Sequence, residues 1–275
     1  MRFIRKYLTK HTKKQAVPQD KRFSSRLGYA ILGTMIFIVF WALAGLYIFR
    51  RPGYEQFSGF LPIPSAKAFY ALLFDGDFLH SVYASLRRVV VGISIAFILG
   101  FPFGLFIGFY RKLRLISYPP VQFLRMISPL SWMPIALIVF RTFESSICFL
   151  ITMATVWPIM LNTTLGVSHV NPQWIKMALN QGAKNYQLML RIIIPSSVPY
   201  ILTSLRLALG VAWIVLVPAE FLGISSGLGY MINDARDTME YDRLMAIVIS
   251  IGILGFILDG AIQGIRKALN WFWIS

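Results

Sequence analysis

Four charged residues lie within or at the ends of long uncharged stretches of this sequence: Arg125, Arg206, Glu220 and Asp259. A charged side chain is costly inside a bilayer, so such residues often have a function, although an ion pair between helices would also explain them. Arg206 and Glu220 share a seven-residue spacing with Trp213, which places all three roughly on one helical face. We therefore expect that face to border a polar pathway.

A second group of polar residues surrounds several prolines. The uncharged stretch 115–140, interrupted by Arg125, contains Pro119, Pro120, Pro129 and Pro134. Each interior proline removes a helical hydrogen bond, and such breaks are tolerated at membrane depth where the freed groups face protein or a cavity. The hydroxyls of Ser128 and Ser131 and the indole of Trp132 lie here, so we expect this segment to line the pathway. Hydroxyl and arginine donors suit a small anion.

Other kinds of chemistry are poorly represented. Cys148 is the single cysteine, and the three histidines, His11, His80 and His169, have no partner at the spacing of a helical metal site. The G-x-x-x-x-G-K-[ST] nucleotide loop is absent from the sequence. We expect no catalytic residue, metal or bound cofactor in this chain. Arg87 and Arg88 are expected at the outer interface, in contact with lipid headgroups.

The composition indicates that these residues are held by membrane-spanning helices. Of 275 residues, 57% are hydrophobic and 14% charged, which lies outside the range of soluble domains. A span needs roughly 18 or more apolar residues. Six candidate spans follow: 28–49, 89–110, 115–140, 145–168, 192–218 and 244–258.

The basic residues predict the orientation of these spans. The formal net charge is +16, and nine of the 27 Lys and Arg residues precede residue 28. Cytoplasmic loops are enriched in Lys and Arg, so we expect both termini in the cytoplasm. The predicted organisation is a basic tail (1–27), a first helix and outer loop with a short amphipathic segment (28–80), a core of five spans (81–265), and a C-terminal tail (266–275).

A polar segment separates the fourth and fifth spans, and prolines 172 and 195 bound it. Residues 174–190 favour helix on both sides of Gly182, so we expect two short helices broken at that glycine. Met177 and Tyr186 would give this cytoplasmic segment an apolar surface. We expect it to be a docking element.

This segment resembles the EAA loop of ABC-importer permeases. Ala178 and Gly182 match the second alanine and the glycine of that motif, and 192–195 matches its Ile-x-Leu-Pro end. Lys176 and Met177 replace the family's Glu and first Ala. Further pieces are similar to permeases for nitrate, sulfonates, taurine and bicarbonate: 85–89, 128–136, 205–213, 219–222 and 227–230.

The resemblance implies an all-α, type I ABC-importer permease fold with six transmembrane helices and a cytoplasmic coupling helix in loop 171–195. It implies a dimer with a second, identical or closely related permease, two cytoplasmic ATPase subunits that hold ATP and Mg, and an extracytoplasmic binding protein, in the bacterial inner membrane. The implied ATPase-docking residues are Lys176, Met177, Ala178, Gly182, Ala183, Tyr186, Ile192 and Pro195. The residues expected along the pathway are Ser128, Ser131, Trp132, Arg206, Trp213 and Glu220.

The sequence bears on three classes of function. The first is import of a small anion (sulfonate or taurine, nitrate, or bicarbonate) by alternating access. An ion-coupled secondary transporter or channel is the alternative, but intramembrane carboxylates are few and no inverted repeat is evident. A membrane enzyme would need clustered catalytic groups, which the sequence lacks. The basic charge is explained by orientation and anionic lipid, with no nucleic-acid partner expected.

Overall fold

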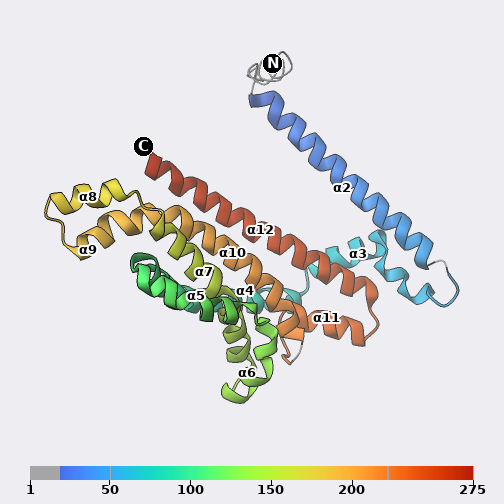
Figure 1. The fold of residues 1–275 in the computed structure, drawn as a ribbon. Helices are drawn as coiled ribbons and strands as arrows, with labels where there is room; N and C mark the ends of the chain where they lie inside the picture. The colour runs from blue at the N-terminus through green and yellow to red at the C-terminus, as the bar shows by residue number, and fades with distance from the viewer. Residues whose placement is uncertain (1–18, 50, 222, 275) are drawn as a thin grey trace, which may run out of the picture. The chain divides into compact units, whose positions relative to one another are not determined.

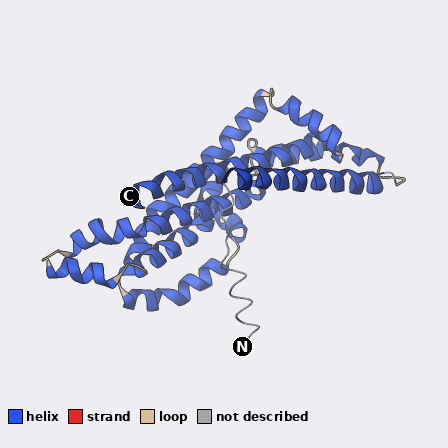
Figure 2. Cartoon of the chain, turned by 90° about the horizontal axis from the view of Figure 1, so that it is seen from above, coloured by secondary structure: helices blue, strands red, loops and turns tan. Residues whose placement is uncertain are grey.

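The computed structural model describes residues 19–49, 51–221 and 223–274, with side chains for 28–49, 51–221 and 223–265. Within those ranges every regular element is a helix, and no strand occurs (Figure 2). Contacts divide the chain into two compact units, residues up to 64 and residues from 65. Each unit is described by itself.

The first unit contains one long helix and a short one. Helix α2 (Gln19–Phe49) is followed by the 3-10 helix η1 (Glu55–Phe60). The apolar part of α2, Gly28–Phe49, has 22 residues, or about 33 Å at 1.5 Å per residue, which is enough to cross a bilayer core. The helix begins nine residues before the predicted start. The rest of the predicted basic tail, residues 1–18, lies outside the described residues.

The second unit is a helical bundle, labelled in Figure 1. Helix α3 (Pro62–Leu72) crosses the boundary between the units and overlaps the predicted amphipathic segment. The further elements are α4 (Gly76–Phe109), α5 (Arg111–Met126), η2 (Pro129–Trp132), α6 (Met133–Val139), α7 (Phe143–Ser168), α8 (Pro172–Asn180), α9 (Asn185–Leu188), the π-helical turn η3 (Met189–Ile193), α10 (Ile194–Phe221), α11 (Leu228–Asp237) and α12 (Tyr241–Ile274). Residues 266–274, predicted as a tail, continue α12 as helix.

Five of the six predicted spans are single helices, and the third is broken. Among the described residues, α2, α4, α7, the helical run ending in α10, and α12 are long and apolar enough to cross a membrane. The predicted span 115–140 instead forms α5 and η2–α6, bent by 85°. Ser128 is extended (φ −58, ψ 131) because a residue before proline, here Pro129, is disfavoured in the helical region. Counted as one span, the bent pair brings the total to six.

Helices α4 and α7 pack closely along a stripe of small residues. The stripe repeats every four residues and comprises Gly92, Ala96, Gly100, Gly104 and Gly108. A Cβ added at Gly92 would lie 2.5 Å from the side chain of Ile151, and one at Gly104 would lie 2.6 Å from the Met160 carbonyl. Close backbone approach of this kind drives helix association in lipid. Thr152 and Thr164 strengthen it, since their hydroxyls donate to the Gly92 and Gly104 carbonyls, each at 3.1 Å.

The stripe sets how the bundle is arranged. Along α4 and α7 the contacts advance together, so the two helices run parallel. Helix α7 also packs against α10, where Leu150 and Ile151 share one buried cluster with Leu216 and Ala219. Glu144 and Glu220 therefore lie at one end of the bundle, while α8 and α9 form a hairpin at the other (Figure 1).

Candidate functional site

The hairpin of α8 and α9 joins the end of α7 to the start of α10. Helix α8 begins where the side chain of Asn171 accepts a hydrogen bond from the Gln173 N–H at 2.9 Å, with Pro172 at the first helical position. The first position suits proline because its missing N–H would have no helical partner there. The two predicted helical pieces are thus present, separated as predicted at Gly182.

Gly182 ends α8 in a left-handed conformation, φ +79. The Ala183 N–H donates to the Ala178 carbonyl at 3.0 Å, and the Gly182 N–H to the Leu179 carbonyl at 2.9 Å. This pair of bonds is a Schellman motif, which favours glycine at this position. Apart from its chain neighbours and the backbone of its own helix, no atom of the described residues lies within 4 Å of an added Cβ, so the requirement for glycine here is conformational rather than steric.

The hairpin exposes apolar and basic side chains together. Its exposed apolar residues are Trp174, Met177, Leu179, Tyr186 and Leu190. Lys176, Lys184 and Arg191 are also exposed, and residues 171–195 contain no acidic residue. Of the predicted docking residues, Lys176, Met177, Gly182 and Tyr186 are exposed, whereas Ala178, Ala183, Ile192 and Pro195 are half-buried. The surface is therefore apolar with a positive charge.

The base of the hairpin is packed into the bundle. Ile193, 1% exposed, contacts a cluster that contains Val167 and Val170 at the end of α7 and Leu105 and Phe109 of α4. Leu188 of α9 is also buried. A force on the hairpin would thus reach α4, α7 and α10 through packed side chains.

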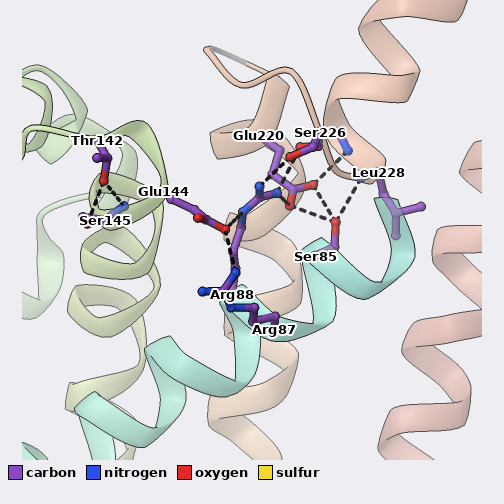
Figure 3. Close-up of polar contacts among 10 residues, drawn as sticks. Ser85, Arg87, Arg88, Thr142, Glu144, Ser145, Glu220, Ser226 and Leu228 are labelled. Atoms are coloured by element: carbon purple, nitrogen blue, oxygen red, sulfur yellow. Dashed lines mark hydrogen bonds and ion pairs between the residues drawn. The ribbon is translucent and has the colours of Figure 1, made fainter. Parts of the chain in front are cut away.

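The opposite end of the bundle holds a buried ion pair (Figure 3). Arg88 of α4 is 2% exposed and Glu220 of α10 is 0% exposed. Arg88 Nη1 donates to Glu220 Oε1 at 2.6 Å, and Ser85 Oγ lies 2.8 and 2.9 Å from the two carboxylate oxygens. Buried charges of this kind are tolerated only when they are paired and hydrogen-bonded. Arg88 was expected to contact lipid headgroups; that expectation is wrong, because Glu220 holds it inside.

The same carboxylate organises the start of α11. The Gly229 N–H donates to Glu220 Oε2 at 3.0 Å, and the Leu228 N–H to Ser85 Oγ at 3.0 Å. These amides at the helix N-terminus have no helical acceptor, and negative charge is favoured there. Glycine is required at position 229, because a Cβ at Gly229 would lie 2.3 Å from the Val217 carbonyl oxygen. Sequence pieces 85–89, 219–222 and 227–230 thus meet in one network.

The other charges predicted along the fifth span face a different helix. Arg206 Nε and Nη2 donate to the two carboxylate oxygens of Asp259 in α12, at 2.6 and 3.0 Å. Trp213 Nε1 donates to the Ile251 carbonyl of α12 at 3.2 Å. Arg206 and Trp213 therefore contact α12, whereas Glu220 contacts α4 and α11. Their roles in a pathway stay predictions.

A cavity of about 810 Å³ lies between α5, α7 and α10. Its polar lining includes Arg114, Gln122 and Arg125 of α5 and Asn162 of α7. The predicted segment borders it through Pro129, but Ser128, Ser131 and Trp132 do not line it, and neither do Arg206, Trp213 and Glu220. Ser128 and Ser131 are exposed, and Trp132 is half-buried.

Sequence reasoning did not identify Arg114, Gln122 and Asn162 as cavity residues. The hydrophilic side chains of residues 111–126 alternate with apolar ones at helical spacing, so the amphipathic character of α5 is readable from the sequence. Which helix faces that polar side is not readable, because it depends on the bend after α5.

Comparisons with known proteins agree with this architecture. A family described as "Binding-protein-dependent transport system inner membrane component" matches residues 100–270. A putative ABC transporter permease protein of Methanocaldococcus jannaschii is 34% identical over 239 residues, covering 85% of this chain and 88% of its own length. The bicarbonate transport system permease protein CmpB of Synechococcus elongatus is 35% identical over 195 residues, 70% of each chain.

The fold also resembles solved structures. The MetNI methionine ABC transporter, in an inward-facing conformation, has a chain that matches with a TM-score of 0.58 and 15% sequence identity, covering 69% of this chain and 94% of that one. This likeness concerns the fold, and the sequence matches concern the family. The chain belongs to the binding-protein-dependent transport system inner membrane components, the permease subunits of ABC importers.

Proposed function

We propose that this permease carries a small oxyanion to the cytoplasm, driven by ATP hydrolysis in separate subunits that dock on the α8–α9 hairpin. The observation that carries the proposal is the hairpin itself, which exposes apolar and basic side chains outside the apolar helices while its base is packed against α4 and α7. Such a surface suits a protein partner, because scattered exposed apolar residues need no explanation but a contiguous group usually marks an interface.

The hairpin supplies the mechanical connection. When ATP binding brings two ATPase subunits together, each would move the hairpin that it holds. Ile193 and Leu188 are buried at its base, so the movement would be transmitted to the spans rather than absorbed in a loop. Alternation between outward and inward openings then follows from a shift in populations. ATP and Mg would be bound by those subunits.

The further assembly follows the same reasoning. A second permease, identical or closely related, would complete the pathway, and a binding protein outside the cell would deliver the substrate. With the hairpin in the cytoplasm, the basic residues 111–114 and both termini lie on the cytoplasmic side of the inner membrane. The Arg88–Glu220 network then lies at the outer side.

The substrate class is supported by the 810 Å³ cavity and by the relative named for bicarbonate. Arg125 lines this cavity and forms no ion pair among the described residues, whereas Arg206 is neutralised by Asp259. An oxyanion that loses water in the pathway needs charged hydrogen-bond donors in exchange. Bicarbonate, nitrate and sulfonates such as taurine all present such oxygens.

The docking test compares two methionines. We expect Met177→Glu, at a residue 61% exposed on the hairpin, to abolish co-purification of the ATPase subunit. Met239→Glu is the matched control, because Met239 is 68% exposed in the turn between α11 and α12 at the other end of the bundle. Equal co-purification by both variants would overturn the docking proposal.

The substrate test uses ATP hydrolysis by the assembled transporter with its binding protein. We expect bicarbonate, nitrate or taurine to stimulate hydrolysis, and Arg125→Gln to raise the half-maximal anion concentration about tenfold, equivalent to about 1.4 kcal/mol. Arg111→Gln in the same helix is the control, since Arg111 is exposed and outside the cavity. Identical anion dependence in both variants would remove Arg125 from the pathway.

A further inference from the structure

Two cavities share lining residues at the ends of α4 and α7 that lie opposite the hairpin. A polar one of about 400 Å³ is lined by residues that include His80, Ser225 and Ser226. An apolar one of about 520 Å³ extends along α4 and α7. Both are lined by Arg87, Arg88 and Glu144. We call the two cavities together the groove, with a charged rim at the three shared residues and an apolar trough along α4 and α7.

The rim lies where a bilayer's headgroups would be. On α4 the uncharged stretch starts directly after Arg88, and on α7 directly after Glu144. The two helices run parallel, so both enter the hydrocarbon at the same level. A charged rim followed by two uncharged helices is what the boundary between headgroups and acyl chains requires.

The trough spans most of the depth of one leaflet. On α4 its lining residues recur every four positions as Val91, Ile95 and Leu99. From Val91 to Leu99 the helix rises by about 12 Å at 1.5 Å per residue, and Arg87 at the rim lies about 6 Å before Val91. Half of a hydrocarbon core of about 30 Å is about 15 Å. On α7 the facing positions include Phe149 and Met153, which are also apolar.

Of the two arginines at the rim, Arg87 is the more accessible one. Arg88 is committed to Glu220 and Ser226. The Arg87 side chain is 60% exposed, and its nearest carboxylate, Glu144 Oε1, is 3.8 Å away and itself 45% exposed. A phosphodiester needs such a donor, and a guanidinium matches it geometrically. Figure 3 shows Arg87 beside Arg88 and Glu144 at this rim.

We propose that a phospholipid binds in this groove, with its phosphate at Arg87 and one acyl chain in the trough between α4 and α7. The charged rim selects the headgroup, and the apolar trough distinguishes a lipid from a soluble phosphate. The bound lipid would thereby contact the helix that carries Arg88 and the helix that carries Glu144, next to the buried network but without replacing any of its bonds.

The test is native mass spectrometry of the full-length protein, delipidated in detergent and titrated with dioleoylphosphatidylglycerol. Val91→Trp places an indole in the trough. Val90→Trp is the matched control, because Val90 is the adjacent residue and is outside both cavities. We expect Val91→Trp and Arg87→Gln each to weaken lipid binding about tenfold, and Val90→Trp to leave it unchanged. Lys67→Gln, an exposed cation in α3 outside both cavities, controls for loss of charge.

Three results would overturn the proposal. The first is equal lipid binding by Val91→Trp and Val90→Trp. The second is binding of glycerol phosphate, the soluble headgroup, as tightly as the lipid, which would make the rim a site for free phosphate compounds. The third is a change in permease dimerisation, with unchanged lipid binding, in Val91→Trp, which would make the groove a protein interface. None of these results depends on substrate transport.

Discussion

The two ends of the bundle differ in whether their charged side chains are paired within the chain. At the end opposite the hairpin, the Glu220 carboxylate accepts hydrogen bonds from Arg88, Ser85 and the start of α11, and it is fully buried. At the hairpin end, Lys176 and Arg191 are exposed and form no ion pair among the described residues. Charges satisfied within the chain fix its architecture, whereas basic residues beside exposed apolar ones are suited to a partner.

The largest expected effect on stability comes from removing the buried Arg88–Glu220 ion pair. Glu220→Ala leaves the Arg88 guanidinium buried without its counter-charge, so we expect the free energy of unfolding to fall by about 3–5 kcal/mol. Thermal unfolding in detergent measures it. Glu144→Ala is the matched control: that carboxylate is half-exposed and 3.6 Å from Arg88 Nε, and its loss should cost about 1 kcal/mol or less. Similar losses of stability in the two variants would contradict the distinction between the buried Glu220 and the half-exposed Glu144.

An intermediate and local effect is expected in the hairpin. Gly182→Ala places a side chain at φ +79, which costs about 1–2 kcal/mol in that turn. Because no further atom lies within 4 Å of the new Cβ among the described residues, we expect no steric cost beyond this strain and only a small fall in the unfolding temperature. Co-purification of the ATPase should fall, and Gly182→Asn should restore part of it, since Asn tolerates this conformation better. A bundle destabilised equally by Ala and Asn would contradict a purely conformational role.

The smallest effect is expected at the Arg206–Asp259 pair, which lies between the two extremes. Its side chains are 39% and 37% exposed. Removing one partner by Asp259→Asn should lower the unfolding temperature only slightly, and less than Glu220→Ala does, because solvent screens a partly exposed ion pair. A loss of stability as large as that of Glu220→Ala would show that the Arg206–Asp259 pair is as important for the fold as the buried network.

Local sequence features predicted part of this structure. Uncharged length identified the spans, and the proline-bounded polar segment with Gly182 identified the hairpin, because each signal acts within a few residues. The partner of Arg88 is 132 positions away, and no local pattern connects Arg88 with Glu220. Burial of that arginine therefore could not be read from its position near an interface.

The predicted pathway shows a related limit. Heptad spacing placed Arg206, Trp213 and Glu220 on one face, but α12 covers the first two and α4 with α11 covers the third. The break at Pro129 turned α5 so that its polar face, with Arg125, borders the cavity. Rotation and tilt of a helix are set by its neighbours, which spacing within one helix does not reveal.

ATP-dependent uptake into proteoliposomes tests the central claim most directly. The vesicles would hold the complete transporter, with ATP on the hairpin side and the loaded binding protein on the other. We predict that oxyanion uptake requires ATP and is lost with Met177→Glu, while Met239→Glu retains it and all three proteins unfold at the same temperature. Uptake that proceeds without ATP, driven by an ion gradient and unaffected by Met177→Glu, would contradict the account and favour an ion-coupled transporter.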